Sequence, residues 1–577
     1  MIAFGRELGD YQVARRKEYL LTTPWSYCSS SLAGNTRKYH GLLVHHNRVA
    51  LSTLDEFLNG HRISSASYAG QVQAEGLSHI RSFSLYPPRF IYEVEGVLLQ
   101  KTFVLRANLQ IRYDILGEAS LTVVPLIADR SIHETQQELN FSGQTSAHGV
   151  RFDHLTLHSD RMMFTEHPDT YWNVWYQEDF ERGCSHQEHL HAPGRFSLSG
   201  ENLSISLNAT VPERVPLRGR GRVQSPSHPL GCLYRAADDF YTGETLYAGF
   251  HWFVDPWGRD AFVSLPGLLL TRGRFREAER VFRFFQARIR NGLIPNRVPD
   301  SFTSSDATLW FLNALKQYAD LRERNDFIRE MVPCIEELLA TYPESGVATL
   351  DKDLIAVAPL STWMDTPFTP REGKPVEVNA LWIDALRFAR SLDIDPPVSP
   401  EHAERSFRRF WNPEKGCLYD CIDPPDPAIR PNQVFAAALG VVDRTMEKEL
   451  LRTVTHHLLT PVGLRTLSPT EATYRGIWAG DATYHNGCVW PWLMGPYVDA
   501  LLRHGTPPER LSPLLEPLFA HLHEAGLGSI SECFDGDAPY TPRGCISQAW
   551  SVGEVIRAAH LIRRAMQGSV AGSPLSV

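Results

Sequence analysis

RGRGRVQSPSHP, residues 218–229, divides the chain, because the spacing of hydrophobic residues changes there. Its Gly, Ser and Pro content is typical of a linker between domains, and a basic interaction patch is the alternative. Before it, apolar residues recur at every second position; after it, they recur at every third or fourth. The sequence therefore predicts a β-domain over residues 1–217, the linker, and a helical domain over residues 230–577.

The N-terminal part alternates polar and apolar residues from Arg48 to about Asn208. In FIYEVEGVLLQKTFVL, residues 90–105, the alternation predicts two strands joined by a turn at Glu95-Gly96. Period-two patterning with β-branched and aromatic residues is typical of half-buried antiparallel strands. Many such strands in succession predict a large antiparallel β-sandwich.

The C-terminal part has the hydrophobic spacing of helices. Apolar residues at intervals of three and four form one stripe along a predicted helix: Phe275, Ala278, Val281, Phe282, Phe285 and Ile289. The same spacing recurs in residues 381–389 and 552–559. Loops rich in Gly, Pro and Trp, rather than strands, are expected between the helices. About 350 residues follow the linker, enough for roughly twelve helices of ordinary length. That number suits a closed double ring of helices.

Composition excludes several classes of function. A chain of 577 residues predicts two large domains, and a formal net charge of −9 argues against nucleic acid or a phospholipid surface as partner. No apolar run is long enough to span a membrane. Acidic residues within the first ten positions predict no signal peptide. The nine scattered cysteines predict reduced thiols in a cytoplasmic protein.

Aromatic residues concentrate in the C-terminal loops. Ten of the 13 tryptophans follow residue 228. Sugar rings pack on aromatic faces while their hydroxyls bind charged and amide groups, so this composition favours a carbohydrate pocket. The alternative is that these tryptophans are large core residues.

Two loops carry the carboxylates that a glycosidase requires. In STWMDTP, residues 361–367, Asp365 stands near Trp363 without an adjacent Lys or Arg, which predicts a desolvated acid with a raised pKa. SISECFDGD, residues 529–537, supplies a second cluster that includes Glu532. Composition alone leaves further candidates nearly equal to these: Asp306, Glu372, Glu377 and Asp481.

Three further loops carry binding candidates. WFVDPWGRD, residues 252–260, contains an Arg-Asp pair that could clamp sugar hydroxyls or form a structural ion pair. REGKPVEVNALW (371–382) and YHNGCVWPW (484–492) are predicted to form pocket walls. His485 is expected to form hydrogen bonds rather than bind metal.

Other motifs argue against a metal or cofactor. Three histidine pairs are expected to lack the spacing and acidic partners of a metal site: His45-His46, His456-His457 and His521/His523. There is neither a glycine-rich phosphate loop nor a nucleophile elbow. These motifs therefore do not indicate a metal site or a cofactor.

Ordered motifs reveal a family resemblance. They are AGNTRKYHGLLV (33–44), WGRD (257–260), GLIPNR (292–297), DATLWF (306–311), TWMD (362–365), GKPVEVNALW (373–382), RPNQ (430–433), GLRTLS (463–468), YH (484–485) with VWPW (489–492), and TPRGC (541–545). Through them the chain resembles, over almost its whole length, the bacterial and archaeal type of glycogen debranching enzyme. The similarity is to its amylo-α-1,6-glucosidase part, glycoside hydrolase family 133.

The resemblance implies a β-sandwich followed by an (α/α)6 toroid like that of glucoamylase. It implies an inverting hydrolase, with no cofactor and no metal, in which Asp365 is the general acid and Glu532 the general base, with the two carboxyls roughly 6.5–9.5 Å apart. The expected substrate-binding residues are Trp257, Arg259, Asp260, Asp306, Trp310, Trp363, Glu377, Asn379, His485 and Trp490.

The resemblance also implies the partners. The substrate would be an α-glucan such as glycogen, a limit dextrin or a branched maltodextrin, with glucose released. No strand–helix alternation of about 250 residues is present to build a glucanotransferase barrel, so a separate transferase is expected as functional partner. Three places depart from the family pattern and put the preferred substrate length in doubt: TTPWSYCSS (22–30), IWAGDAT (477–483) and Cys533.

Rival interpretations stay open at this point. They are a glucoamylase-like or trehalase-like hydrolase of different linkage preference, a phosphorylase on the same architecture, a helical-toroid sugar epimerase, and a glucan-binding protein without catalysis.

Overall fold

The computed structural model describes residues 2–213, 226–322 and 326–570. The chain forms two compact units, unit 1 with Met1–Arg235 and His521–Gly528, and unit 2 with Ala236–Ala520 and Ser529–Val577. Most of the expected linker, residues 218–225, lies outside the described residues. The boundaries at residues 217 and 230 therefore stay predictions.

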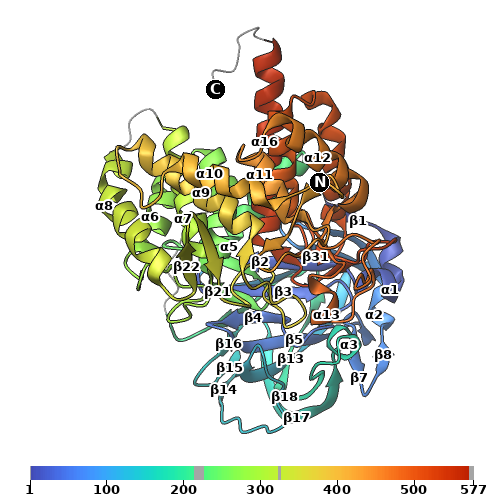
Figure 1. Ribbon diagram of the computed structural model, residues 1–577. Coiled ribbons are helices and arrows are strands. Elements are labelled where there is room, and N and C mark those ends of the chain that lie inside the picture. The colour runs from blue at the N-terminus through green and yellow to red at the C-terminus, as the bar shows by residue number, and fades with distance from the viewer. Residues whose placement is uncertain (1, 214–225, 323–325, 571–577) are drawn as a thin grey trace. The chain divides into compact units, whose positions relative to one another are not determined.

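Unit 1 is built from two large antiparallel sheets (Figure 1). The first has the order β1 (Ala3–Phe4), β9 (Ile80–Ser84), β10 (Arg89–Val94), β11 (Val97–Leu105), β12 (Leu109–Leu116), β19 (Ser204–Thr210), β16 (Thr156–His158), β15 (Gly149–Arg151) and β14 (Gln144–Ser146). The second has the order β2 (Glu18–Thr22), β3 (Ser26–Ser31), β4 (Gly41–His45), β5 (Arg48–Leu58), β13 (Glu118–Ser131), β18 (Gln187–Glu201), β17 (Met163–Trp175), β7 (Ala66–Tyr68) and β8 (Gln71–Gln73), with β6 (His61–Arg62) beside β5. Short helices α1 (Tyr11–Ala14), α2 (Glu75–Ser78) and α3 (Gln177–Glu181) lie between strands.

Side chains from the two sheets meet in a common core. Tyr19 of β2 packs against Phe83 and Phe103 of the first sheet. Glu56 of β5 is buried and accepts a hydrogen bond from Tyr113 of β12 at 2.6 Å. These contacts confirm the predicted antiparallel β-sandwich.

The hairpin of β10 and β11 forms where the alternation predicted it. Val94 pairs with Val97, and the turn residues Glu95 and Gly96 have φ of 49° and 81°. Both turn residues thus lie in the left-handed region that two-residue hairpins require. The predicted turn is confirmed.

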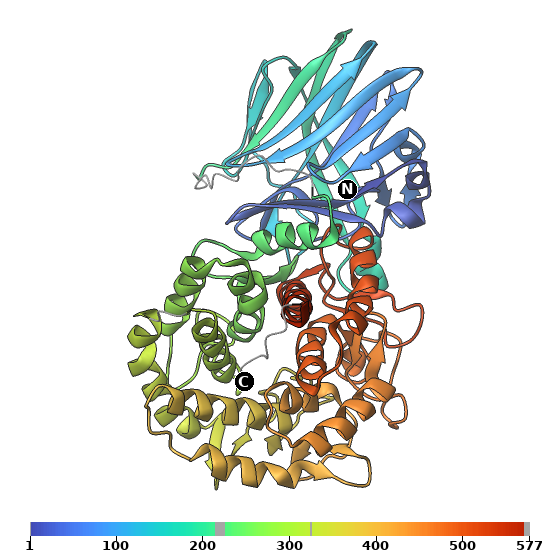
Figure 2. The same cartoon turned by 90° about the horizontal axis from the view of Figure 1, so that it is seen from above.

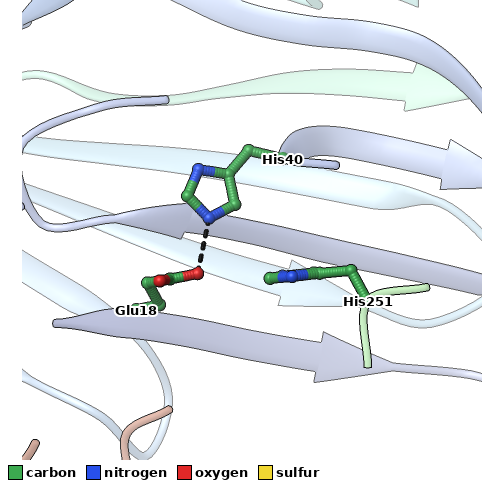
Figure 3. Close-up of side chains that lie close together, drawn as sticks. All are labelled: Glu18, His40 and His251. Atoms are coloured by element: carbon green, nitrogen blue, oxygen red, sulfur yellow. Dashed lines mark hydrogen bonds and ion pairs between the residues drawn. The ribbon is translucent and has the colours of Figure 1, made fainter. Parts of the chain in front are cut away.

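The N-terminal motif of residues 33–44 surrounds a buried carboxylate on β2. Glu18 Oε2 lies 2.7 Å from His40 Nε2 (Figure 3), and Arg37 Nε donates to Glu18 Oε1 at 3.0 Å. A buried carboxylate needs such partners to offset its desolvation. In unit 1 this motif therefore ties β2 to the segment between β3 and β4.

The inner helices of unit 2 form a closed ring (Figure 2). Each packs against the next in the order α5 (Gly258–Leu268), α7 (Ala307–Asp320), α9 (Val376–Ser391), α11 (Val434–Ala438), α14 (Met494–His504) and α16 (Ala549–Val570), and α16 packs against α5. Every residue of α5 is buried, as expected for a helix covered on all sides. The six inner helices among the described residues confirm the predicted helical toroid.

Amphipathic helices cover the inner ring. They are α6 (Phe275–Gln286), α8 (Asp326–Thr341), α10 (Pro400–Phe407), α12 (Arg444–Leu458) and α15 (Glu516–Ala520), while α4 (Pro229–Phe240) precedes the ring and α13 (Asp481–Tyr484) is a single turn. The predicted stripe of α6 is buried from Ala278 to Phe285, but Ile289 lies beyond the end of the helix. The periodicity therefore located the helix and overran its C-terminus.

Short strands occur in the loops of unit 2, where none were predicted. The sheets are β20 (Tyr247–Phe250), β21 (Phe253–Pro256) and β33 (Ser547–Gln548); β22 (Ala348–Asp351) and β23 (Leu354–Val357); β24 (Lys374–Pro375) and β27 (Cys421–Ile422); β25 (Trp411–Asn412) and β26 (Cys417–Leu418); and β28 (Leu459–Thr460), β29 (Gly463–Arg465), β30 (Val489–Trp490), β31 (Cys533–Phe534) and β32 (Pro542–Arg543). The expectation of loops without strands was wrong because strands of two to four residues show no periodicity.

Among the described residues, none of the helices is both long and apolar enough to cross a membrane. All nine cysteines are free thiols. The expected cytoplasmic location stays a prediction.

Candidate active site

Arg259, in the first turn of α5, joins two carboxylates from distant parts of unit 2. Its Nε donates to Asp306 Oδ1 at 2.8 Å, and its Nη1 lies 3.2 Å from Asp365 Oδ2. Its Nη2 bonds Ser304 Oγ and the carbonyl of Ser361, each at 3.2 Å. Because a guanidinium holds its donors in one plane, these bonds fix the three segments relative to one another.

Asp306 is the residue before α7, and only one of its oxygens is satisfied. Ser304 Oγ donates to Asp306 Oδ1 at 2.5 Å, the oxygen that also accepts from Arg259. Asp306 Oδ2 is buried and has no hydrogen-bond partner among the described residues. A buried acceptor without a donor marks a position where a ligand hydroxyl can bind.

Asp365 is the more accessible of the two carboxylates bound by Arg259, with 38% of its side chain exposed against 0% for Asp306. Desolvation raises the pKa of Asp365 above its ordinary value, Arg259 opposes that shift, and Asp306 adds to it. An accessible carboxyl with a raised pKa has the properties of a general acid.

Asp260 faces the same cluster but bonds a different partner. Its Oδ1 accepts from Gln548 Nε2 at 3.3 Å, and it forms no ion pair with Arg259 among the contacts of the described residues. Burial raises the pKa of Asp260 to about 7; Arg259 opposes this shift, and the charges of Glu532 and Asp365 add to it. Asp260 therefore lies close enough to both proposed catalytic carboxyls to feel their charge.

Glu532 is held by two hydrogen-bond donors. The Tyr484 hydroxyl donates to Oε1, and the backbone N–H of Cys545 donates to Oε2 at 2.8 Å. The pairing of β30 with β31 and of β31 with β32 brings these loops together. Both donors stabilise an ionised carboxylate, which suits a base.

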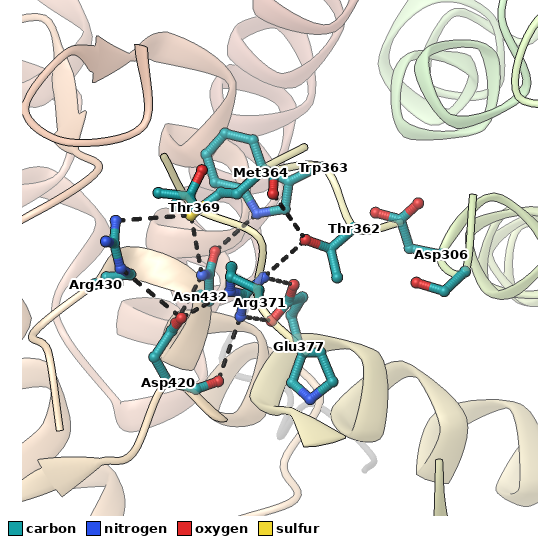
Figure 4. Close-up of polar contacts among 12 residues, drawn as sticks. Asp306, Thr362, Trp363, Met364, Thr369, Arg371, Glu377, Asp420, Arg430 and Asn432 are labelled. Carbon is teal, nitrogen blue, oxygen red and sulfur yellow. Dashed lines mark hydrogen bonds and ion pairs between the residues drawn. The ribbon is translucent and has the colours of Figure 1, made fainter. Parts of the chain in front are cut away.

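The loop that carries Asp365 is held by a buried hydrogen-bond chain (Figure 4). Trp363 Nε1 donates to Asn432 Oδ1 at 2.8 Å, and Asn432 Nδ2 donates to Asp420 Oδ1 at 2.7 Å. Arg371 Nε donates to Asp420 Oδ2 at 2.7 Å, and Arg371 Nη1 reaches Thr362 Oγ1 at 3.1 Å. The two residues at positions 362 and 363 are thus fixed by groups outside the loop.

Two predicted binding residues are engaged elsewhere. Both carboxylate oxygens of Glu377 bond Arg371, and Glu377 is buried. Desolvation raises the pKa of Glu377, and Arg371 opposes the shift. The side chain of Asn379 bonds the backbone of Ile355 and Pro375. The structure does not bring these two side chains into the Arg259 cluster.

Aromatic rings line the loop of Asp365. Trp363 contacts His485, Trp490 and Trp492 with ring centroids 5.5, 5.4 and 5.2 Å apart. Burial lowers the pKa of His485 far below its ordinary value, and nearby arginines, among them Arg259, lower it further. The His485 ring is therefore neutral and can accept or donate one hydrogen bond to a neutral ligand.

Trp257 and Trp310 occupy different settings. Trp257 is the residue before α5, and its Nε1 is buried without a partner among the described residues. Trp310 is only 7% exposed and packs against Phe435 and Trp492. Trp310 therefore meets the Asp365 loop through Trp492 rather than directly.

Several buried polar atoms near this cluster lack partners within the described ranges. They are Trp257 Nε1, Asn296 Oδ1, Asp306 Oδ2, His485 Nε2 and Gln548 Oε1. Buried polar groups are normally satisfied, so these atoms leave hydrogen-bonding capacity unused near the cluster.

Two histidine pairs have acidic partners that the sequence did not reveal. His45 Nε2 and His46 Nε2 lie 3.4 and 3.2 Å from Glu213 Oε2, and His521 Nδ1 lies 3.1 Å from Glu524 Oε2. The expectation that these pairs lack acidic partners was wrong: Glu213 is distant in sequence from His45 and His46, and Glu524 follows His521 by three positions.

Sequence reasoning did not single out five residues of this region: Tyr484, Gln548, Arg371, Asp420 and Asn432. Tyr484 precedes His485 in the loop of residues 484–492, and Asn432 lies in the RPNQ motif, so the sequence could have identified both as site residues. No sequence pattern marked Asp420 or Gln548 as a site residue. Long-range pairing of β24 with β27, which follows Asp420, and of β20 with β33 brings them to this region.

The sequence matches two family models and a curated relative. Residues 233–557 match the family model described as amylo-alpha-1,6-glucosidase, and residues 17–203 match glycogen debranching enzyme N terminal. The glycogen debranching enzyme of Saccharomyces cerevisiae is 24% identical; the match covers 42% of this chain and 24% of the yeast protein. The chain thus spans about a quarter of that relative.

Solved structures with a similar fold come from Thermus thermophilus. The GH63 mannosylglycerate hydrolase, in complex with Tris and D-glycerate, is 13% identical with a TM-score of 0.44 over 57% of this chain and 99% of that chain. An uncharacterized conserved protein has the same identity and TM-score, over 56% and 98%.

The family match extends over more than half of the chain and includes both proposed catalytic carboxylates. The chain therefore belongs to the amylo-α-1,6-glucosidase family of glycogen debranching enzymes.

Proposed function

We propose that the protein hydrolyses α-1,6-glucosidic branch points of an α-glucan with inversion, using Asp365 as acid and Glu532 as base. The observation that carries the proposal is the contrast between the two carboxyls. Asp365 has a raised pKa, whereas Glu532 receives two hydrogen bonds that favour its ionised form. Environments that separate two carboxyls in this way assign an acid and a base.

In the proposed reaction, Asp365 gives its proton to the glycosidic oxygen as the bond to the anomeric carbon breaks. Glu532 takes a proton from a water, whose oxygen bonds the anomeric carbon from the opposite face. The products are β-glucose and a shortened glucan with a free hydroxyl. Exchange with solvent then returns a proton to Asp365 and removes one from Glu532.

The unpaired buried atoms support a neutral sugar as the bound group. Asp306 Oδ2 and Gln548 Oε1 are unpaired acceptors for hydroxyls, and Asp260, whose Oδ1 accepts from Gln548 Nε2, is a further carboxylate beside them. Trp257 Nε1 and His485 Nε2 add polar groups at the edge of aromatic surfaces. We further propose glycogen, limit dextrin or branched maltodextrin as substrate and a separate glucanotransferase as functional partner.

The test is proton NMR of glucose released from a maltodextrin with single α-1,6-glucosyl branches, recorded before mutarotation. We expect β-glucose from the wild type and none from D365N or E532Q. E330Q, which alters an exposed carboxylate on α8, is the control and should retain activity. Release of α-glucose, cleavage of linear maltose only, or a requirement for phosphate would overturn the proposal.

A further inference from the structure

A cavity of about 520 Å³ is lined by residues of unit 2. Asp260, Asp306 and Gln548 stand at the N-terminal ends of inner helices. The cavity reaches from early turns of these helices, at Phe262 of α5 and Trp310 of α7, to later turns, at Asp320 of α7 and Arg564 of α16. Its charged lining residues on α7 and α16 therefore lie away from Asp306 and Gln548 along those helices.

An aromatic layer separates the cavity from the Asp365 loop. Trp310, Phe435 and Trp492 line the cavity, are buried, and contact one another. Trp492 also packs against Trp363, and its Nε1 has no hydrogen-bond partner among the described residues.

One face of α7 presents polar side chains to this cavity. Asn313, Lys316, Gln317 and Asp320 all line it, at the spacing where a helix packed into a core carries apolar residues. Gln317 Nε2 donates to Asn313 Oδ1 at 2.8 Å, and Asn313 Nδ2 donates to Asp384 Oδ2 at 3.0 Å. The wall is thus an organised polar surface.

The charges on the wall do not cancel. Lys316 pairs with Asp384, and Arg557 pairs with Asp499 and Glu554. The remaining charged lining residues, Arg503, Arg563, Arg564 and Asp320, form no ion pair within the part of the chain that the structure describes. The three arginines are exposed and Asp320 opposes one of them, while Arg557 faces two carboxylates, so these groups together leave a surplus of one positive charge.

We propose that this cavity binds a monosaccharide that carries a phosphoryl group. A phosphate monoester is an anion, which suits a lining with surplus positive charge, and arginine forks bind its oxygens in pairs. Asp320, Asn313 and Gln317 are partners for sugar hydroxyls, and the tryptophans offer ring faces. The volume falls within the roughly 300–1,000 Å³ of small-molecule sites.

The test is isothermal titration calorimetry of the full chain with glucose 6-phosphate, inorganic phosphate and glucose. We expect one saturable site for glucose 6-phosphate, weaker binding of phosphate by roughly tenfold, and a loss of affinity with added salt. Tryptophan fluorescence should change on binding, because Trp310 and Trp492 line the cavity.

Two variants localise the site, R503Q and the double variant R563Q/R564Q. Each should weaken glucose 6-phosphate binding at least about tenfold. R276Q, an exposed arginine of α6 outside the cavity, is the matched control and should bind like the wild type. Absence of saturable binding, equal affinity for glucose and glucose 6-phosphate, or unchanged affinity in both variants would overturn the proposal. Hydrolysis of the branched maltodextrin is measured separately. Failure of glucose 6-phosphate binding can therefore be distinguished from failure of the proposed hydrolysis.

Discussion

Arg259 Nη1 lies 3.2 Å from Asp365 Oδ2, so the proposed general acid has a fixed cation at its side. The Arg259 cation favours the ionised form of Asp365, whereas a general acid must be protonated. Burial prevails and leaves the pKa of Asp365 raised, with Asp306 adding to the shift. The same guanidinium therefore positions the acid and limits how far its pKa rises.

Replacing Arg259 by Gln should move the alkaline limb of the kcat/KM profile to higher pH. The acid works while protonated, and loss of the neighbouring cation raises the pKa of Asp365 further. We expect kcat/KM at its optimum to fall roughly 100-fold because positioning is lost. Profiles on branched maltodextrin measure both effects.

Arg259→Lys is the matched control, because it keeps the charge and loses the planar fork. Its alkaline limb should stay near that of the wild type while kcat falls. An alkaline limb that moves equally in both variants would contradict the electrostatic role.

Tyr484→Phe should move the acidic limb of the profile to higher pH. The Tyr484 hydroxyl donates to Glu532, so its removal disfavours the ionised carboxylate that a base requires. We expect kcat to fall about tenfold. Tyr474→Phe removes a similar hydroxyl bond, to Asp537, at an exposed position and should leave the profile unchanged. An unshifted limb in Tyr484→Phe would argue against Glu532 as the base.

Most of the architecture was accessible from the sequence, because it rests on local periodicity. The hairpin at Glu95-Gly96 and the buried face of α6 follow from spacings within one element. Asp365 and Glu532 were reached through motifs, and the raised pKa of Asp365 through its position near Trp363. The sequence identified Arg259 as a binding residue but not its ion pairs, since its partners Asp306 and Asp365 lie 47 and 106 positions away.

Gly544→Ala should impair catalysis more than stability alone explains. A Cβ at Gly544, where φ is +68°, would stand 2.1 Å from Glu532 Oε2. Gly273 has a φ of +70° and no atom within 4 Å of the same position. Both substitutions cost about 1 kcal/mol of backbone strain. Only Gly544→Ala should also lower kcat, because Glu532 must move; equal kcat values in the two variants would contradict this. Thermal unfolding and kinetics separate the effects.

Asp260→Asn should stabilise the fold above neutral pH. The pKa of Asp260 is raised from 3.8 to about 7, so the folded chain holds a proton that the unfolded chain releases. The stabilisation is complete below about pH 4 and is lost as pH rises through about 7. In unfolding experiments at about pH 8, the variant should gain roughly 1–3 kcal/mol over the wild type, and little at about pH 4. Exposed Asp300→Asn is the control. Equal gains at both pH values would refute a raised pKa.

Asn432→Leu should separate positioning from substrate binding. Asn432 accepts from Trp363 Nε1 and donates to Asp420, so a leucine of similar size leaves an indole N–H and a carboxylate oxygen unpaired. The cost should be about 1–3 kcal/mol for each group. Because Trp363 stands two positions before Asp365, we expect kcat to fall at least about tenfold with a smaller change in KM.

Asn412→Leu provides the comparison. Asn412 is also buried in unit 2, but its Oδ1 accepts from the backbone of Glu414 and Lys415 in a turn. This variant should lose stability without loss of kcat, measured at a temperature where both variants are folded. A parallel loss of kcat in the two would mean that Asn432 acts through general stability. A loss confined to Asn432→Leu would mean that the hydrogen-bond chain behind Trp363 holds the acid in its reactive position.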